Sequence, residues 1–543
     1  TLRPYNPEGV QFIEKAKILK NGNGWLVNDD TPVKLDEKPD KILFSNYREG
    51  DVFFRLDEEP KATSKTCRIG MVTSAAFQRI EAYQEDRSVG INIPLPPSED
   101  FPHLKNSRSW AEAEKEAADL QVPDSQIKFL YDTATRTLIH LSAGSIIPGP
   151  YTYNRFWFRD ACIMLNALLA IGLKNRSLRH LNTFADHQTR EGFFHSQDGE
   201  WDSNGQVLWI LNRYRLLSGG DLNTDWITPI ISGARWIDDK RIRSTKNPKV
   251  KGLLPSGFSA EHFGPNDNYY WDDFWAVAGL YAAADTMASQ GLKKEENNIR
   301  RIAIEMEKDL FHSISLVAEE KKTSAIPTSP NRRLDSGAIG SIVADYPLQL
   351  LPPGDKSMMA TAGFLMNNCL QKGSFFQDMI HSGINIYMTL ELAQVYLRAG
   401  DPRFRKLLKS AASFASPTGQ WPEAIHPLTD GGCMGDGQHG WAVAEWLMLI
   451  RNMFIMDEKD ALMIGRGVLP EWLERKKKLA YGPTLTPFGK VSVQIDCSNR
   501  CPSVKLLADW YDTPPRDIIV CLPGYKKHPL SGPDYQCTVE ISE

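Results

Sequence analysis

The sequence RDACIMLNALLAIGL at residues 159–173 decides the fold, because it is apolar on nearly every side and has a glycine near its close. A helix that is apolar all round is expected in an inner layer, covered by other helices. Further stretches share this character and carry glycine near the expected helix ends. They are SNGQVLWILNRYRLLSGG at 203–220, DDFWAVAGLYAAADTMASQG at 272–291, MIHSGINIYMTLELAQVYLRAGDP at 379–402 and HGWAVAEWLMLIRNMFIM at 439–456.

More amphipathic helices are predicted between these inner ones, at 177–190, 224–242, 296–314 and 402–415. Inner and outer helices thus alternate, and a recurring pair predicts an α-hairpin toroid with about six pairs. In such a ring the loops that precede the inner helices would all open on one face. The fold class predicted is therefore multidomain and mainly α, an (α/α)6 toroid.

The two ends of the chain differ from this helical middle. Residues 1–128 contain short apolar runs separated by Gly, Asp, Pro and Lys, which predict an N-terminal β domain. A polar run of strong helix formers near 109–122 predicts a linker helix. The barrel is expected at 129–456. Strand-like runs between Pro and Gly turns predict a small β region at 457–543.

Composition limits the function classes. The chain has 543 residues, 42% hydrophobic and 24% charged, with a net charge of −4. This composition excludes wholesale disorder and gives no electrostatic footprint for nucleic acid or for a membrane surface. No apolar run is long enough for a membrane span. We expect a soluble protein, either cytoplasmic or exported after loss of a signal peptide, and the sequence leaves the oligomeric state open.

Eight cysteines are too sparse for a disulfide scaffold. Cys497 and Cys501 form a C-x₃-C pair, with Cys521 and Cys537 downstream. Their irregular spacing leaves free thiols, one or two disulfides, or a zinc site as alternatives. No established metal-ligand spacing occurs elsewhere, so no metal and no cofactor are expected.

Clusters that combine carboxylates with aromatic side chains precede the predicted inner helices. They lie at residues 156–160, 198–206, 259–273, 376–378 and 420–427, the last followed by 435–441. Aromatic rings suit sugar binding because a ring face packs on the apolar face of a pyranose. Cleavage of a glycosidic bond needs two carboxylates, one protonated to donate to the leaving oxygen and one ionised. For any single carboxylate, a helix cap or an arginine partner is the structural alternative.

The motifs resemble those of the six-hairpin glycosidases, a group that includes glucoamylases, maltose phosphorylase-like enzymes and the glucosidase domain of glycogen-debranching proteins. The matching segments are YNRFWFRDA at 153–161, GEWDSNGQVLW at 199–209, SAEHFGPNDNYYWDD at 259–273, and GQWPEAIHP at 419–427 followed by GWAVAEW at 440–446. Many members also have an N-terminal β-sandwich, a helical linker and a small C-terminal sheet. The resemblance implies Glu261 as general acid, with Asp272 or Glu200 as alternatives, and Glu423 as general base.

The resemblance also implies which side chains bind substrate. Several would hold sugar hydroxyls and several aromatic rings would line the pocket. These residues are Arg159, Asp160, Trp157, Trp201, Asp202, Gln206, Trp271, Asp272, Trp421, His426 and Trp441. The predicted function is an inverting, exo-acting glycoside hydrolase on a glucoside-like oligosaccharide.

Rival functions remain open. A glycoside phosphorylase would use phosphate in place of water as the nucleophile. His426 and His439 are compatible with that alternative, whereas the carboxylate of Glu423 favours water. A sugar epimerase or polysaccharide lyase on a similar toroid, or a non-catalytic glycan-binding protein, are the others. The G-x-G-x-x-G match at 435–440 lacks a preceding strand and is interpreted as a loop.

Overall fold

The computed structural model describes residues 1–543 except 7–8, 11, 79–88, 95–108, 221, 259–264, 380–381, 475–477, 500, 533–534 and 540–543. The chain divides into two compact units. The smaller unit comprises residues 1–109 together with 431–433, and the larger comprises 110–430 and 434–543. Each unit is described by itself.

The smaller unit is built from β-strands. One sheet has the order β7-β3-β4-β5-β9, and β6 pairs with β8 in a second, antiparallel ladder. Trp25 of β4 and Ile42 of β6 are both buried in one apolar cluster, and the Trp25 indole donates to Ser74 Oγ. The strands are β3 (Lys15–Ile18), β4 (Gly24–Val27), β5 (Thr31–Leu35), β6 (Lys41–Asn46), β7 (Ser64–Thr66), β8 (Val72–Phe77) and β9 (Ile91–Asn92).

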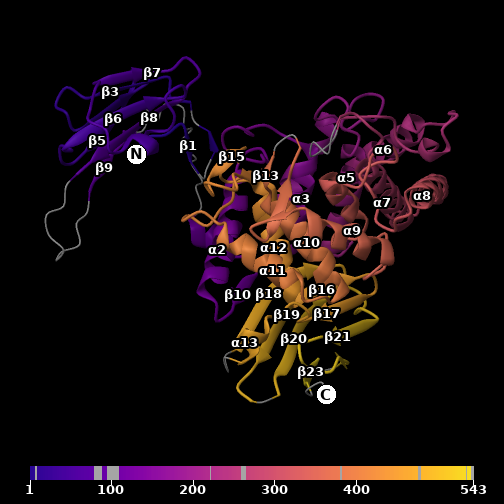
Figure 1. The fold of residues 1–543 in the computed structure, drawn as a ribbon. Helices are drawn as coiled ribbons and strands as arrows, with labels where there is room; N and C mark the ends of the chain where they lie inside the picture. The colour runs from indigo at the N-terminus through magenta and orange to yellow at the C-terminus, as the bar shows by residue number, and fades with distance from the viewer. Residues whose placement is uncertain are drawn as a thin grey trace. The chain divides into compact units, whose positions relative to one another are not determined.

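In the described part of the larger unit, inner helical segments contact one another in a closed cycle. α3 contacts α5, α5 contacts α7, α7 contacts η6, η6 contacts α10, α10 contacts α12 and α12 contacts α3. Figure 1 draws α3, α10 and α12 beside one another. The inner segments are α3 (Phe158–Ala170), α5 (Ser203–Leu217), α7 (Tyr270–Ser289), the 3-10 helix η6 (Ser336–Ala344), α10 (Ile386–Ala399) and α12 (Gly440–Phe454).

The outer helices each pack against inner ones, as the alternation of apolar and amphipathic stretches predicts. α2 contacts α12, α4 contacts α3, α6 contacts α5 and α7, α8 contacts α7, α9 contacts η6, and α11 contacts α10. The outer helices are α2 (Ser125–Leu141), α4 (Lys174–Leu181), α6 (Ile227–Lys240), α8 (Lys293–Lys321), α9 (Lys356–Asn368) and α11 (Phe404–Ser413).

Glycines allow the inner helices to approach closely. A Cβ on Gly205 of α5 would lie 2.3 Å from the backbone of Trp275, and one on Gly279 of α7 would lie 2.4 Å from the Gly205 carbonyl oxygen. A side chain at either position would push α5 and α7 apart. The two glycines therefore fix how near the starts of these helices, and the loops before them, come to each other.

Strands flank the helices of the larger unit. One sheet has the order β10-β18-β19-β20-β23, and in a second β17 pairs antiparallel with β16 and parallel with β21. Figure 1 shows β18, β19 and β20 side by side. The strands are β10 (Asp119–Gln121), β16 (Ile455–Glu458), β17 (Ala461–Ile464), β18 (Lys478–Thr486), β19 (Gly489–Asp496), β20 (Ser503–Trp510), β21 (Asp517–Val520), β22 (His528–Pro529) and β23 (Gln536–Thr538).

Two local predictions differ from the structure. The helix expected near 109–122 is confined to α1 (Trp110–Glu114), because Asp119–Gln121 instead pairs with β18. The inner segment η6 (Ser336–Ala344) was not predicted, since it is short, contains two glycines and forms a 3-10 helix in place of an α-helix. In both places a contact distant in sequence outweighs local preference.

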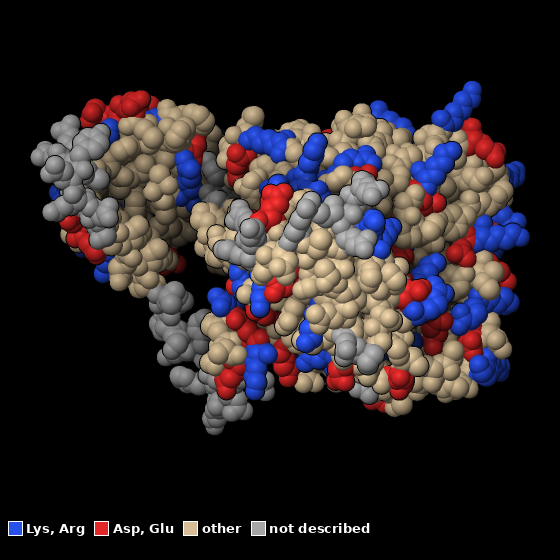
Figure 2. Space-filling view, turned by 90° about the horizontal axis from the view of Figure 1, so that it is seen from below, with Lys and Arg blue, Asp and Glu red and all other residues tan. Residues whose placement is uncertain are grey.

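All eight cysteines are free thiols. No described helix is both long and apolar enough to cross a membrane. On the face of the larger unit drawn in Figure 2, basic and acidic side chains are intermixed, in agreement with the nearly balanced charge.

Candidate functional site

Glu423 lies in the loop before α12 and is 5% exposed. The phenol of Tyr153, from the loop before α3, donates a hydrogen bond to Glu423 Oε2. The Asn385 side-chain amide, at the start of α10, donates to the Glu423 carbonyl oxygen over 3.0 Å. Segments far apart in sequence therefore hold both the backbone and the carboxylate of this residue.

The carboxylate of Asp436 organises the loop that carries Tyr153. It accepts hydrogen bonds from the backbone N–H groups of Tyr151, Thr152 and Tyr153 at 3.2, 2.8 and 2.9 Å. A Cβ on Gly149 would lie 2.2 Å from Asp436 Oδ2, so only glycine fits there. Asp436 thus fixes the turn from which Tyr153 reaches Glu423.

A second group of charges surrounds Arg159, in the first turn of α3. Its guanidinium lies 3.3 Å from Glu200 Oε2 and 3.1 Å from Asp202 Oδ2. The same Asp202 oxygen accepts from the Trp271 indole at 2.9 Å and from Gln206 Nε2 at 3.0 Å. Each of these side chains is buried from solvent. A buried charge is tolerated when it is paired and hydrogen-bonded in this way.

Asp160 connects the two groups. Its pKa is raised to about 7, chiefly by burial; the Arg159 charge opposes this rise, and the charges of Glu423 and Glu200 contribute to it. Asp160 is therefore close enough to both glutamates to feel their charge. Burial also raises the pKa of Glu200, against the lowering effect of Arg159.

Asp272 and its neighbour Asp273 begin α7 and have different surroundings. Burial raises the pKa of Asp272 well above its ordinary value, and the nearby charge of Asp202 adds to the effect. Asp273 Oδ1 accepts from the Leu254 backbone N–H at 2.8 Å, and burial raises its pKa to about 8. Asp272 thus belongs to the acidic cluster, whereas Asp273 anchors the neighbouring loop.

Aromatic rings are packed against the acidic cluster. Trp441 lies 4.8 Å from Tyr387 and 6.1 Å from Trp271 between ring centroids, and Tyr387 lies 5.0 Å from the His439 ring. Burial lowers the pKa of His439, which favours a neutral imidazole.

Trp157 is the aromatic residue on the other side of Tyr153. Their ring centroids are 5.9 Å apart, and the Arg155 guanidinium lies 3.4 Å over the indole of Trp157. An indole covered by a cation has one face already occupied.

Three further predicted residues make other contacts. Trp421 is fully buried and donates its indole N–H to the Ala411 carbonyl at 2.8 Å, so it is part of the apolar core. Trp201 packs with Trp236, and a lysine ammonium lies 4.0 Å from its ring. His426 is exposed and accepts from the Leu428 N–H at 3.2 Å.

Glu261 lies outside the described residues, within 259–264. The described residues on either side are anchored beside the acidic cluster. Gly257 pairs with Asp267, and the Phe258 N–H donates to the Gly199 carbonyl over 2.7 Å. Gly199 directly precedes Glu200 in the chain.

Tyr153, Asp436 and Tyr387 also belong to the candidate site by their contacts, although no sequence pattern marks them. Tyr153 stands in the quoted 153–161 motif and Asp436 in the glycine-rich loop at 435–440. The only available signal was their place beside predicted site residues, because their partners are distant in sequence. Among the described residues, no group of three or more His, Cys, Asp or Glu side chains is arranged to hold a metal ion.

No family model and no curated protein sequence matches this chain. Solved structures do. The native α-L-rhamnosidase from Aspergillus terreus has a TM-score of 0.51 at 14% identity, with 98% of this chain and 61% of that chain covered. A GH78 family rhamnosidase of Bacillus sp. GL1 has a TM-score of 0.52 at 13% identity, covering 75% of this chain and 43% of that one.

A bacterial glucoamylase complexed with acarbose is also similar, with a TM-score of 0.48 at 13% identity, covering 82% of this chain and 76% of that chain. The likeness to the two rhamnosidases shows the fold, and the predicted resemblance to the six-hairpin glycosidases is confirmed at that level.

Proposed function

We propose that this chain is a glycoside hydrolase, inverting and exo-acting on a glucoside-like oligosaccharide. The observation that carries the proposal is the buried cluster in which Glu423, held by Tyr153, faces Asp160 and the Arg159–Glu200–Asp202 group, with aromatic rings alongside. Acid–base cleavage of a glycosidic bond requires one carboxyl with a raised pKa as proton donor and a second, ionised carboxylate.

In the proposed mechanism Glu423 removes a proton from water as the water attacks the anomeric carbon. Glu261 donates a proton to the departing oxygen from the opposite face. The anchoring of Gly257 and Phe258 beside Gly199 supports a general acid near Glu200. Glu200 itself, with its raised pKa, and Asp272 are the alternative donors.

Substrate binding is proposed to use the same cluster. Arg159, Asp160, Asp202 and Gln206 would hold sugar hydroxyls, while Trp157, Trp271 and Trp441 would border the sugar rings. The proposed layout is an (α/α)6 toroid at 129–456 with an N-terminal β-sandwich-like domain at 1–128 and a C-terminal β region at 457–543. The closed cycle of inner helices and the flanking sheets support the order of these parts, whereas residues 110–128 belong to the larger unit.

Replacing each proposed catalytic carboxylate by its amide tests the assignment. Glu423→Gln and Glu261→Gln are each expected to lower turnover by roughly 10²–10⁴ with little loss of binding, because the amide keeps shape but not proton transfer. Glu319→Gln, on the exposed surface of α8, is the matched control. Near-normal turnover of Glu261→Gln together with a large loss in Glu200→Gln would move the general acid to Glu200.

One screen separates the rival functions. α- and β-linked glucosides and rhamnosides are incubated with and without phosphate, and fresh product is followed by NMR. Hydrolysis with an inverted anomeric carbon supports the proposal. A sugar phosphate, an epimer or an unsaturated sugar as product would identify the phosphorylase, epimerase or lyase instead. Retention of configuration would exclude an inverting mechanism.

A further inference from the structure

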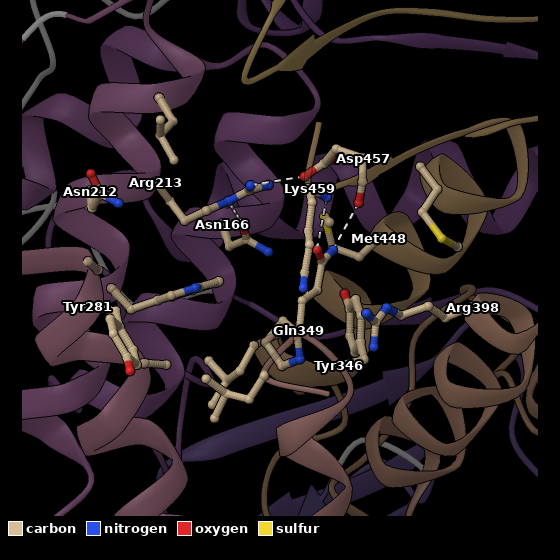
Figure 3. A pocket seen from close by; sticks show the side chains of 18 of the residues that line it. Asn166, Asn212, Arg213, Tyr281, Tyr346, Gln349, Arg398, Met448, Asp457 and Lys459 are labelled. Carbon is tan, nitrogen blue, oxygen red and sulfur yellow. Dashed lines mark hydrogen bonds and ion pairs between the residues drawn. The ribbon is translucent and has the colours of Figure 1, made fainter. Parts of the chain in front are cut away.

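A cavity of about 340 Å³ lies in the larger unit, at the ends of the inner helices that are away from the acidic cluster (Figure 3). Asn166 lines it from the same helix that carries Arg159, and Asn212 from the helix that follows Asp202. At 1.5 Å of rise per residue these pairs are separated by about 10 and 15 Å along the helices. The cavity is therefore distinct from the acidic cluster.

Hydrogen-bond donors without partners face this cavity. Arg213 Nε donates a hydrogen bond to Asn166 Oδ1 over 3.4 Å, and Arg213 Nη1 donates one to Asp457 Oδ2 over 3.0 Å. The remaining nitrogen, Nη2, has no partner among the described residues. The amide nitrogens of Asn166 and Asn212 also have no partner there. Both asparagines are more than nine-tenths buried, and both side chains line the cavity.

The acceptor oxygens of the same side chains are, by contrast, occupied. Asp457 accepts from Arg213 with one oxygen and pairs with Arg451 through the other at 2.5 Å. Asn212 Oδ1 accepts from Arg215 Nε at 3.0 Å and from Thr286 Oγ1 at 3.1 Å. The cavity thus offers donors to a ligand and few acceptors.

The net charge of the side chains that line the cavity also favours an anionic ligand. Arg398 is neutralised by Asp345 and Glu458, and Asp285 is paired with Arg300. The lining side chains that remain are Arg213, Arg451 and Lys459 against Asp457, three positive charges and one negative. Packing of the helix ends explains the Arg–Asp pairs, but it does not explain the unpartnered donors beside them.

We propose that this cavity binds an oxyanion, either free phosphate or the phosphate of a small sugar phosphate. Arg213 Nη2 and the asparagine amides would donate to its oxygens. Lys459, exposed in the turn between β16 and β17, would neutralise charge at the entrance. Guanidinium groups suit phosphate because they combine charge with directed donors.

Binding to the full chain is measured by calorimetry and thermal shift with inorganic phosphate and with glucose 6-phosphate, at fixed ionic strength maintained with chloride. We expect at least one probe to bind and to raise Tm. Tighter binding of inorganic phosphate identifies the free anion as the ligand, and tighter binding of glucose 6-phosphate identifies a sugar phosphate. If neither probe binds more tightly than chloride, the proposal is overturned.

Variants locate the binding. Arg213→Gln and Lys459→Gln should each weaken it at least about fivefold, since each removes one positive charge. Asn212→Asp keeps the accepted hydrogen bonds and adds a negative charge, so it should weaken binding at least as much even if Arg213→Gln folds poorly. Lys490→Gln, an exposed charge on β19, is the matched control and should bind normally.

A last variant separates this cavity from the acidic cluster. Arg159→Gln should retain phosphate binding, because Arg159 lies in the other site. Loss of binding in Arg159→Gln with normal binding in Asn212→Asp would place the anion in the acidic cluster and overturn the proposal. Since no turnover is measured, failure of the proposed glycosidase activity leaves this test unaffected.

Discussion

At the scale of single residues, the raised pKa of Asp160 makes the stability of the folded protein depend on pH. Burial raises its pKa to about 7, while Arg159 acts in the opposite direction. In the unfolded chain an aspartate releases its proton near pH 4. Between these two values the folded protein holds a proton that the unfolded chain has lost, so its free energy of unfolding falls as pH rises.

Asp160→Asn should remove this pH dependence. From pH 4 to 7 the wild type is expected to lose up to about 1.4 kcal/mol per pH unit through this group, and the variant to lose less. Denaturant unfolding at several pH values measures the difference. Parallel stability curves for the two proteins would show that Asp160 is ionised throughout.

The sequence could predict part of the candidate cluster at this scale. Arg159, Asp202 and Trp271 were found because acidic and aromatic residues mark the starts of apolar helices, and the structure brings them together. The direction of a ring could not be predicted: the Trp421 indole lies in the apolar core and bonds to Ala411, and Trp201 packs with Trp236. No local pattern connects Tyr153 with Glu423, 270 positions later.

At the scale of elements, the loop between α2 and α3 is fixed by a single carboxylate from the loop before α12. Asp436 accepts three backbone N–H groups, and carboxylate acceptors of this kind make strong hydrogen bonds. The position of Tyr153, and through it that of Glu423, depends on this contact.

Gly149→Ala should disturb the contact, because its Cβ would lie 2.2 Å from Asp436 Oδ2. Turnover is expected to fall about tenfold or more, since small displacements of a catalytic group have large effects on rate. Tyr153→Phe should also reduce it. Gly144→Ala is the matched control in the same loop, where a Cβ would meet no atom within 4 Å. Equal activity of both alanine variants would contradict this role for the loop.

A helix could be predicted from the sequence where a long stretch of apolar residues indicates that it is buried. α3, α5, α7, α10 and α12 are apolar on almost all sides, and each was found. The 3-10 helix η6 (Ser336–Ala344) has no such length or period, and its place in the cycle comes only from contacts with α7 and α10. β10 was missed because its neighbourhood is rich in helix formers, whereas its partner β18 is distant in sequence.

At the scale of the whole molecule, the thiols add no covalent links. All eight cysteines are free, which resolves the alternatives for Cys497, Cys501, Cys521 and Cys537 in favour of thiols. Stability must therefore come from packing and hydrogen bonding.

Thiol titration checks this directly. Unfolded without reductant, the protein should react with eight equivalents of Ellman's reagent, and reductant should leave Tm unchanged. The native protein should react more slowly, because burial raises the pKa of Cys497 and Cys537 to about 11 and the thiolate is the reactive form. A titre of six or fewer in the unfolded state would reveal a disulfide.

The pairing of β10 with β18, together with the contact of α12 with α3, has a consequence for biosynthesis. While the ribosome is still translating, the early inner helices have no final neighbour to cover them, and the edge of β10 has no partner. The cycle of inner helices can close only after α12 (Gly440–Phe454) has emerged, so the nascent chain exposes apolar surface while the residues between α3 and α12 are being synthesised. Protection by chaperones during translation would serve this protein more than one assembled from local contacts.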